Sequence, residues 1–525
     1  MDKKRFLIVP SRPTPNGPLH LGHIAGPYLR ADILARYLKQ SGHEVKMVSG
    51  SDVFDSYVLL SSYKEGKHPH EIINYYHNSI KEDLLAMDID MNLYINILEE
   101  PFLTQFQTII ANTFATLHKQ NAVIKQNEKL LYAVNNNKYI IGCWLTGKCP
   151  HCKKTVGSFF CETCGAHFKP EQVIHPQSKI DSDVCEWRNV TSHYLAITNV
   201  KKIIKSLNKL TVPTKYRKVI LNHLSKEQVN FRLSHPGSWG ISYPDQSTEN
   251  IIFASASIIF HCLLYGSFYE KNAFHPKSDV IKIALFGKDV IIPYLIGTTA
   301  FKTTLDYFSG FNHFIINEFY QLEGQKFSTS RGHAIWAKDI IKKTQGISSD
   351  MVRFYLSHAN LAQQSDSFNV KDFLSQSNSV FSKILHLINQ SISQIAGNSH
   401  LMRHSTLSEK IHLILESQNN YLNVERLRID KAIQNVLPWL DEHSTLISAS
   451  DHYYWLKGLA IIFYPFTPAL AKKIWRYLGH SEIPSFHFFY KYPRIQLQAP
   501  SFIYKPITFD DIKPCLPPEL REEIA

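Results

Sequence analysis

Two short signatures, far apart in the sequence, constrain this chain most. The first occupies residues 13–23, with the sequence PTPNGPLHLGH, and the second occupies residues 326–330, with the sequence KFSTS. The first follows the apolar run 6–9, which predicts a buried strand, and precedes residues 28–38, whose apolar spacing predicts an amphipathic helix. A strand, a Gly/Pro turn and a helix N-terminus form a phosphate cradle. Together the two signatures predict a nucleotide site.

The turn itself carries chemistry suited to phosphate. Gly17 and Gly22 allow the backbone to approach a ligand closely, and His20 and His23 are three residues apart, on one face of the first helical turn. Two imidazoles beside exposed helix N–H groups favour negative charge on a polyphosphate. The alternative is a tight turn whose histidines are only solvated or act as caps.

Four of the eight cysteines form two CxxC pairs separated by eight residues. This is zinc-ribbon spacing, because two such turns present four thiolates tetrahedrally, and a closed four-sulfur site is structural rather than catalytic. The alternative is a set of free buried cysteines or a redox pair. The predicted ligands are Cys149, Cys152, Cys161 and Cys164, and the cysteines without partner spacing, expected to be apolar fillers, are Cys143, Cys185, Cys262 and Cys515.

Composition and charge are compatible with a large globular protein that has phosphate-rich partners. The chain has 525 residues, of which 44% are hydrophobic, so it can bury several cores in three or four domains. Its formal net charge is +12, which suits a nucleic acid or nucleotide, although basic surfaces also serve solubility. No signal peptide and no membrane span are predicted, so we expect a cytoplasmic location.

The two signatures support a resemblance to a known family. The HLGH of residues 20–23 resembles the HIGH signature of class I aminoacyl-tRNA synthetases, and KFSTS resembles a variant of their KMSKS loop. Methionyl-tRNA synthetases are the most similar, because they carry a zinc knuckle between these signatures. The GKDV of residues 287–290 and the dipeptide Pro438-Trp439 also resemble segments of that family. The resemblance implies ATP-dependent formation of an aminoacyl-adenylate and its transfer to tRNA, with methionine as the default amino acid, magnesium accompanying ATP, and structural zinc.

The expected fold is α/β, with a Rossmann-type parallel-sheet catalytic domain, an inserted zinc-knuckle connective domain and an α-helical C-terminal bundle. Strand-like runs at 45–48, 251–253 and 281–286 belong to the catalytic domain, and strand patterns vanish after about Asp350. The tail after Pro484 shows no assignable pattern. The expected boundaries are 1–115 and 226–325 for the two catalytic halves, 116–225 for the insertion, 326–375 for the KMSKS-like loop and stem-contact region, and 376–525 for an anticodon-binding-like domain with its tail.

The resemblance also implies roles for individual residues. Asp52, at the end of a predicted strand, would hold the α-amino group, although a cap is the alternative. Thr329 replaces the family's second loop lysine, which predicts slower activation unless Arg331 substitutes. The expected catalytic residues are His20, His23 and Lys326, and the expected ATP-binding residues are Asn16, Gly22, Asp289, Lys326, Ser328, Thr329 and Ser330.

The amino-acid pocket departs most from the family. Arg12 stands where methionyl-tRNA synthetases have an apolar residue, and Ser255 stands where they usually have an acid. The segment around Arg12 resembles the opening of glutamyl-tRNA synthetases, in which an arginine meets the substrate's side chain. An inward Arg12 therefore requires a carboxylate or another strong acceptor, whereas the alternative is a surface salt bridge or a phosphate contact. The other expected pocket residues are Phe253, Phe260 and Tyr294.

The C-terminal region gives a mixed indication of tRNA binding. Trp439 matches the family's stacking tryptophan, but a core position in a helical bundle is equally expected, and the family's anticodon arginine has no counterpart near residues 386–390. Three functions therefore stay open: a synthetase-like ligase, a diverged paralogue that activates another amino acid for a non-translational acceptor, and a non-catalytic tRNA-binding or regulatory protein. The oligomeric state is not predicted.

Overall fold

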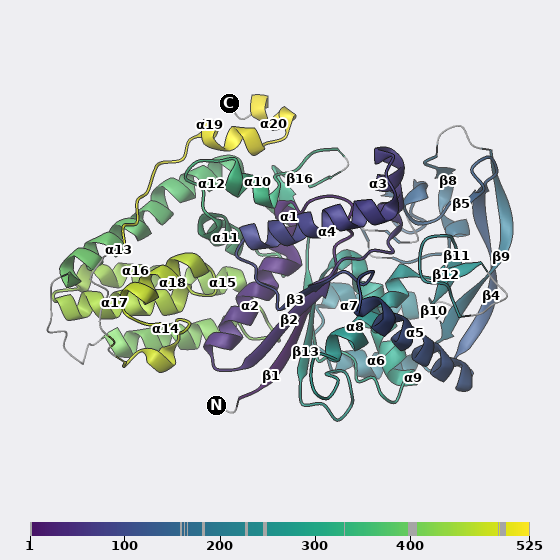
Figure 1. Cartoon of the computed structure of the whole chain (residues 1–525), viewed down its shortest axis with the longest axis horizontal. Helices are drawn as coiled ribbons and strands as arrows, with labels where there is room; N and C mark the ends of the chain where they lie inside the picture. The colour runs from purple at the N-terminus through teal and green to yellow at the C-terminus, as the bar shows by residue number, and fades with distance from the viewer. Residues whose placement is uncertain are drawn as a thin grey trace.

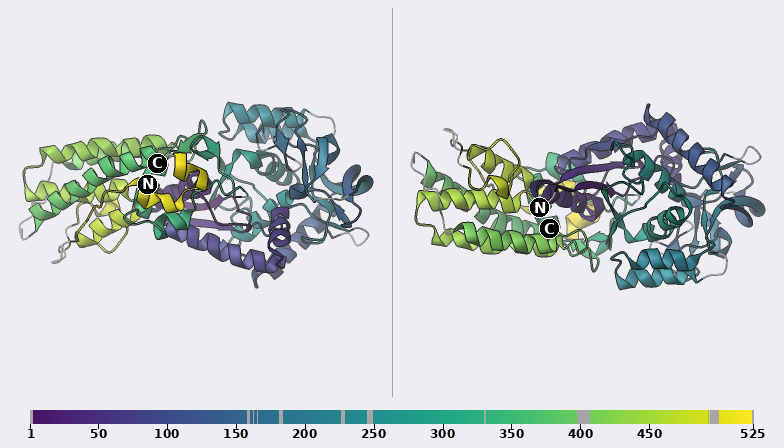
Figure 2. Two further views of the ribbon diagram at one scale, coloured as in Figure 1. Left: turned by 90° about the horizontal axis from the view of Figure 1, so that it is seen from above. Right: turned by 90° about the horizontal axis from the view of Figure 1, so that it is seen from below.

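The protein is elongated, with a parallel sheet at its centre, a helical bundle at one end and antiparallel sheets at the other (Figures 1 and 2). The computed structural model describes residues 3–157, 160–161, 163–164, 166–180, 184–225, 229–244, 249–329, 331–396, 407–491, 493 and 500–523. This arrangement confirms the expected α/β class with a helical C-terminal region.

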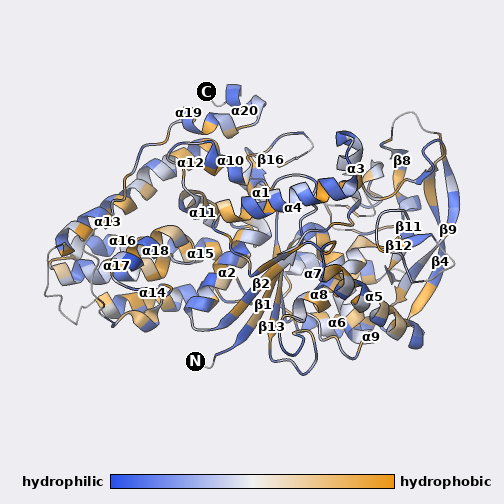
Figure 3. Ribbon diagram, in the orientation of Figure 1, coloured by the Kyte–Doolittle hydropathy of each residue, from blue (hydrophilic) through white to orange (hydrophobic). Residues whose placement is uncertain are grey.

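The central sheet has five strands in the order β14-β13-β1-β2-β3, and every neighbouring pair is parallel. Strands β1 and β13 are nearly continuous runs of buried apolar residues, as expected when helices cover both faces, and parts of the central strands are orange in Figure 3. The strand bounds are Arg5–Pro10 for β1, Glu44–Gly50 for β2, Leu93–Ile95 for β3, Ile281–Gly287 for β13 and His313–Asn317 for β14.

Chain order reverses beside β1, and this reversal positions the site. From β1 the chain proceeds to β2 on one side, whereas β13 joins on the other side with Val9 opposite Ala284. Ligands bind beyond the carboxyl ends of the strands at such a switch point. The helices of the catalytic region are α1 Leu21–His23, the π-helical turn Ile24–Tyr28, α2 Leu29–Gln40, α3 Ser56–Glu65, α4 Pro69–Ala86, α5 Phe102–Lys119, α8 Ile258–Gly266 and α9 Thr298–Thr304.

The insertion between the two catalytic halves contains two antiparallel sheets. The larger has the order β10-β9-β4-β5, built on a long ladder between β4 (Val123–Ala133) and β9 (Cys185–Ala196). The smaller has the order β7-β6-β8 and carries the cysteine pairs. Because β10 (Asn230–Arg232) belongs to the larger sheet, this sheet extends past the expected boundary at residue 225. The remaining bounds are β5 Lys138–Tyr139, β6 Leu145–Lys148, β7 Thr155–Val156, β8 Ile174–Ser178, α6 Val200–Asn208 and α7 Thr214–Leu224.

The C-terminal region is a bundle of amphipathic helices with a continuous aromatic and aliphatic core. A short three-stranded sheet of β15 (Tyr320–Leu322), β16 (Gln325–Lys326) and β17 (Asp366–Phe368) links it to the catalytic region. Its helices are α10 Ala337–Lys342, α11 Ser349–Ser357, α12 Val370–Gln376, α13 Ser382–Ile395, α14 Leu407–Tyr421, α15 Ile429–Gln434, α16 Val436–Asp441, α17 Ala449–Phe463 and α18 Pro468–Tyr477.

The last part of the chain runs back along the bundle toward the centre of the molecule (Figure 1). It ends in two short helices, α19 (Phe509–Ile512) and α20 (Pro518–Glu523). In α20 the Glu519 carboxylate lies 2.8 Å from Nδ1 of His333, just after the KFSTS signature. Within the part of the chain that the structure describes, no helix is long and apolar enough to span a bilayer.

Candidate active site

The HLGH turn lies at the carboxyl end of β1, where the chain enters its first helix. His20 and His23 stack on each other with ring centroids 3.7 Å apart. The backbone N–H of His23 donates to Nδ1 of His20 over 3.2 Å, and the N–H of His20 donates to Nδ1 of His23 over 3.4 Å. Because each Nδ1 accepts a backbone proton, the ring proton of each histidine is on Nε2.

Both histidines are neutral at physiological pH. Burial and the nearby Lys326 ammonium lower the pKa of His23 to about 4. Burial and the neighbouring His23 lower the pKa of His20 well below its usual value. The pair therefore offers two fixed Nε2–H hydrogen-bond donors rather than two positive charges, and Lys326 supplies the cation.

The KFSTS signature lies directly over this turn. Phe327 stacks on His20 at a centroid distance of 4.7 Å. A Cβ atom on Gly22 would lie 2.7 Å from the Phe327 ring, and a Cβ atom on Gly17 would lie 2.9 Å from the Thr329 methyl group, so both positions require glycine for this approach. Residues more than 300 positions apart in sequence thus form one surface, as the two signatures predict.

Asp83 of α4 joins the segment before the HLGH turn to the segment after the KFSTS loop through hydrogen bonds, and it was not identified from the sequence. It is completely buried, and its Oδ2 accepts the backbone N–H of Leu19 over 2.7 Å while its Oδ1 accepts that of Lys338 over 3.2 Å. Burial raises the pKa of Asp83 to about 6. The one sequence signal for Asp83 is its place as an acidic residue among the apolar positions of a predicted helix.

The remaining residues expected at ATP surround the same strand ends. Asp289 follows β13 in a short 3-10 turn, and Asn16 lies in the turn after β1, where its carbonyl accepts a hydrogen bond from Ser61. The Ser328 backbone N–H donates to the His333 carbonyl over 3.0 Å, while Thr329 is exposed. Ser330 lies outside the described residues.

Two acids mark the amino-acid side of the site. Asp52 follows β2, and its backbone N–H donates to the Pro13 carbonyl over 2.9 Å, which joins it to the first turn. Asp55 caps α3 by accepting the backbone N–H of Tyr57 over 2.8 Å. Burial and the adjacent Asp52 raise the pKa of Asp55 to about 7. Asp55 was not identified from the sequence, although its position three residues after Asp52 could have indicated a second acid at the same strand end.

Arg12 points inward, toward Asp52. Its side chain is 5% exposed, and its Nη2 lies 3.4 Å from Asp52 Oδ1 and 3.3 Å from the Ser257 hydroxyl. The arginine is therefore buried rather than part of a surface salt bridge, whereas the alternative of a phosphate contact stays a prediction. Ser257 at the start of α8, with His261 and Tyr265 one and two turns further along that helix, forms a polar surrounding for Arg12 that was not identified from the sequence.

The three aromatic residues expected in the pocket lie in different environments. Tyr294 stacks on Phe286 at 4.2 Å and is close enough to Arg12 to affect its pKa. Phe260 is fully buried and packs against Phe114 and other core aromatics. Phe253 lines a separate cavity of about 420 Å³ between the catalytic region and the knuckle. Tyr294 therefore shares the surroundings of Arg12, while Phe253 is joined to the same region through its carbonyl, which accepts the Ser257 N–H over 3.2 Å.

The four predicted zinc ligands lie together. Their sulfur atoms are all within 4.8 Å of one another, with 3.8 Å between Cys149 and Cys164 and 3.5 Å between Cys152 and Cys161. Tetrahedral zinc with bonds of about 2.3 Å requires sulfur atoms about 3.8 Å apart, so the set fits this ion. The knuckle core includes Tyr57, Leu59 and Leu60 of α3, which connects the metal site to the helix capped by Asp55.

Trp439 lies in the core of the helical bundle. Its exposed fraction is 0%, and its Nε1 donates to the Trp455 carbonyl over 3.1 Å, while Trp455 Nε1 donates to the Trp439 carbonyl over 2.8 Å. The ring is buried, as the core alternative predicts, so it offers no face for stacking on a tRNA base in this structure.

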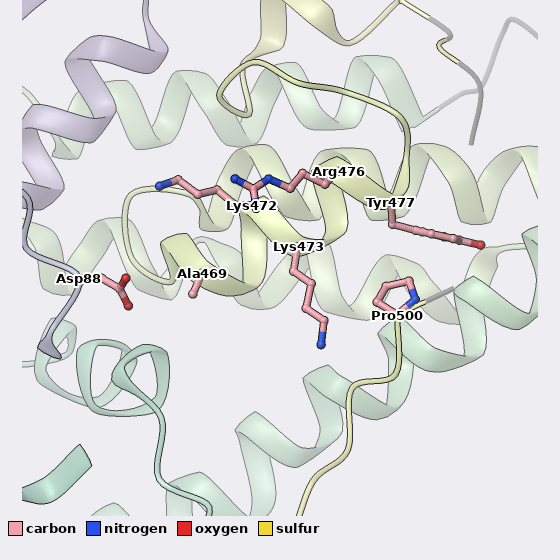
Figure 4. A pocket seen from close by; sticks show the side chains of 7 residues that line it. All are labelled: Asp88, Ala469, Lys472, Lys473, Arg476, Tyr477 and Pro500. Carbon is pink, nitrogen blue, oxygen red and sulfur yellow. The ribbon is translucent and has the colours of Figure 1, made fainter. Parts of the chain in front are cut away.

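A basic hollow lies elsewhere on the bundle, next to the catalytic region (Figure 4). It has a volume of about 510 Å³ and is lined by Lys472, Lys473 and Arg476 of α18, with Asp88 from the catalytic region at its edge. Lys473 points away from the other two and donates to the Ser501 carbonyl over 3.0 Å. Three cations around one hollow favour a phosphate-bearing partner.

Comparison with known proteins agrees with this architecture. The family model described as tRNA synthetases class I (M) matches residues 6–392. A methionine–tRNA ligase from Methanocaldococcus jannaschii is 28% identical over 73% of this chain, which spans 58% of that relative's length. A methionine–tRNA ligase from Parabacteroides distasonis is 26% identical over 91% of this chain and 76% of its own length.

A solved structure provides the corresponding comparison of folds. The methionyl-tRNA synthetase of Mycobacterium tuberculosis in complex with methionyl-adenylate superposes with a TM-score of 0.72 and 14% identity, covering 95% of this chain and 99% of the other. At that identity the likeness concerns the fold alone. Because the family model covers most of its length, this chain belongs to the class I tRNA synthetase (M) family.

Proposed function

We propose that this protein activates an amino acid with ATP to form an aminoacyl-adenylate and transfers the aminoacyl group to tRNA. The observation that carries the proposal is the closure of the KFSTS loop on the HLGH turn, with Phe327 stacked on His20. The relatives named above are methionine–tRNA ligases, so methionine is the reference substrate.

The geometry supports each requirement of adenylation. An oxygen of the amino acid's carboxylate forms a bond to the α-phosphorus of ATP while the bond to pyrophosphate breaks, so negative charge develops on the phosphates. His20 and His23 donate their Nε2–H groups to these oxygens, and Lys326 balances the charge of the leaving pyrophosphate. Asp52 holds the α-ammonium group. Magnesium accompanies ATP as the usual neutralising ion.

The acceptor in this proposal is the terminal ribose of tRNA. The formal net charge of +12 and the hollow beside Lys472, Lys473 and Arg476 support a polyanionic partner. Buried Trp439 does not contribute base stacking in this conformation. We further propose that zinc occupies the four-cysteine cluster and that the protein acts in the cytoplasm.

ATP–pyrophosphate exchange tests the activation step directly. The purified protein, with zinc retained, is assayed with each proteinogenic amino acid. The Lys326→Ala variant is assayed alongside it, with Lys371→Ala, which removes an exposed lysine of α12, as the matched control. Exchange that depends on one amino acid and on Lys326 supports the proposal. The absence of exchange with every amino acid contradicts it. Charging of tRNA is then measured separately with the amino acid that supports exchange.

A further inference from the structure

We propose that Arg12 is a specificity-determining residue that makes the side-chain end of the amino-acid site an anion site, so that the activated amino acid carries a carboxylate on its side chain. The inference rests on the proposed function, because it concerns the substrate of that same adenylation site. Burial, incomplete pairing and charge balance around Arg12 each support it.

The guanidinium group of Arg12 is buried but incompletely paired. Its Nη2 makes both contacts described above, at 3.3 and 3.4 Å, which is the long end of the hydrogen-bonding range. Its Nε is buried and has no hydrogen-bond partner in the described part of the chain. A buried guanidinium with unused donors is costly, and a planar carboxylate is the group that satisfies such donors two at a time.

A second unused donor lies beside Arg12. Tyr265 is 1% exposed, and its hydroxyl has no partner among the described residues. Tyr265 and Arg12 are close enough for each to affect the pKa of the other. The Tyr265 hydroxyl and the Arg12 Nε–H are both donors without an acceptor among the described residues, and they favour a ligand with two acceptor oxygens rather than a thioether, whose sulfur accepts only weakly.

His261 is a third polar side chain beside Arg12. Its Nδ1 lies 2.8 Å from the Ser257 carbonyl, so Nδ1 carries the proton and Nε2 is an acceptor, which has no partner among the described residues. A side-chain amide offers one acceptor for Arg12 and one donor for His261. Glutamine and asparagine are therefore the informative competitors of the acidic amino acids.

Charge balance favours the acid over the amide. In the proposed complex the substrate's α-ammonium group joins Arg12 next to Asp52, so two cations share this carboxylate. Asp55 caps α3 through the Tyr57 N–H and also interacts electrostatically with Arg12, but its pKa of about 7 leaves it only partly charged at neutral pH. A side-chain carboxylate supplies a full anion directly at the guanidinium, whereas methionine and the amides leave Arg12 with the shared Asp52 and the partly protonated Asp55.

The proposal is tested by ATP–pyrophosphate exchange with five amino acids: glutamate, aspartate, glutamine, asparagine and methionine. The variants are Arg12→Leu and Arg12→Lys, and the matched control is Arg5→Leu, an arginine of β1 that pairs with Asp279 at the far end of the strand. Thermal melting verifies that each variant folds. If Arg12→Leu does not fold, Arg12→Lys, which keeps the charge but loses the planar donor pair, carries the test.

We expect an acidic amino acid to support exchange at least about 100-fold better than methionine, since a site built for a charged group leaves its donors unpaired with an apolar one. Arg12→Leu should lower kcat/KM for that acid by about 100-fold, with KM for ATP unchanged. Exchange led by methionine or by an amide overturns the inference and leaves the proposed function standing. An acid preference that persists in folded Arg12→Leu also overturns it. Exchange with no amino acid instead fails the proposed function itself.

Discussion

The two ends of the adenylation site differ in how closely they follow the family pattern. At the nucleotide end, His20, His23 and Lys326 occupy the expected positions and make a compact set of two neutral donors and one cation. At the amino-acid end, Arg12 stands where the resemblance implies an apolar residue, and its buried guanidinium contacts Ser257. In the proposed function, the chemistry of activation and the choice of amino acid therefore depend on separate residues, and mutations test this separation.

Mutation at the nucleotide end should give the largest effect. We expect His20→Ala to lower exchange by about 100- to 1,000-fold with every amino acid, because it removes a fixed donor to the developing phosphate charge. The control is His118→Ala, an exposed histidine near the end of α5. A His20→Ala effect confined to some amino acids would break the separation between the two ends.

Loss of the metal should act selectively on the amino-acid end. Cys161→Ser removes one of the four thiolate ligands and is expected to abolish zinc retention. Because a structural zinc site contributes about 10 kcal/mol or more to local folding, loss of the ion should destabilise the knuckle. The knuckle core packs on α3, whose cap is Asp55, so KM for the amino acid should rise more than KM for ATP. Zinc content is measured by colorimetric chelation, with Cys515→Ser as the control. An equal rise in both constants would argue against this coupling.

Restoring the missing loop charge should sharpen the account of the nucleotide end. Thr329 is exposed and lies over Gly17. Thr329→Lys is expected to raise kcat for exchange by about tenfold, through an added cation near the leaving pyrophosphate. Thr329→Ser, which adds no charge, serves as the control. An unchanged rate in the lysine variant would show that this charge is already supplied elsewhere in the loop.

The smallest expected effect is a difference in pH dependence between the two ends. The pKa of His23, about 4, leaves the histidine donors unchanged from pH 6 to 8, so KM for ATP should be flat. Asp55, with a pKa of about 7, is protonated below this value and charged above it, and its charge lies beside Asp52. KM for the amino acid should therefore fall about two- to threefold from pH 6 to 8. Asp55→Asn should remove the slope, and a slope that survives would assign it to another group.

Local sequence patterns predicted the fold class and the cysteine cluster well. The apolar run before the Gly/Pro turn forms β1, and the two CxxC pairs bring four sulfurs together, because each depends on short-range spacing. The approach of Phe327 to Gly22 followed only from pairing two distant signatures, since nothing local places the loop on the turn.

Other features depend on tertiary contacts that one sequence does not encode locally. The inward direction of Arg12 depends on contacts with Ser257, 245 residues away. The sequence left Trp439 as either a base-stacking residue or a core residue, and reciprocal hydrogen bonds with Trp455 fix it in the core. The tail after Pro484 showed no periodicity, yet Glu519 contacts His333 through a short helix held by neighbouring elements.

The most direct test of the separation between the two ends is the binding of non-hydrolysable adenylate analogues. Isothermal titration would compare the sulfamoyl-adenosine derivatives of aspartate, glutamate and methionine, which share one nucleotide and differ only in the amino acid. We predict that an acidic derivative binds at least about tenfold more tightly than the methionine derivative, a difference of about 1.4 kcal/mol. Tightest binding of the methionine derivative would contradict the account of the amino-acid end, and binding of none would contradict the account of the nucleotide end.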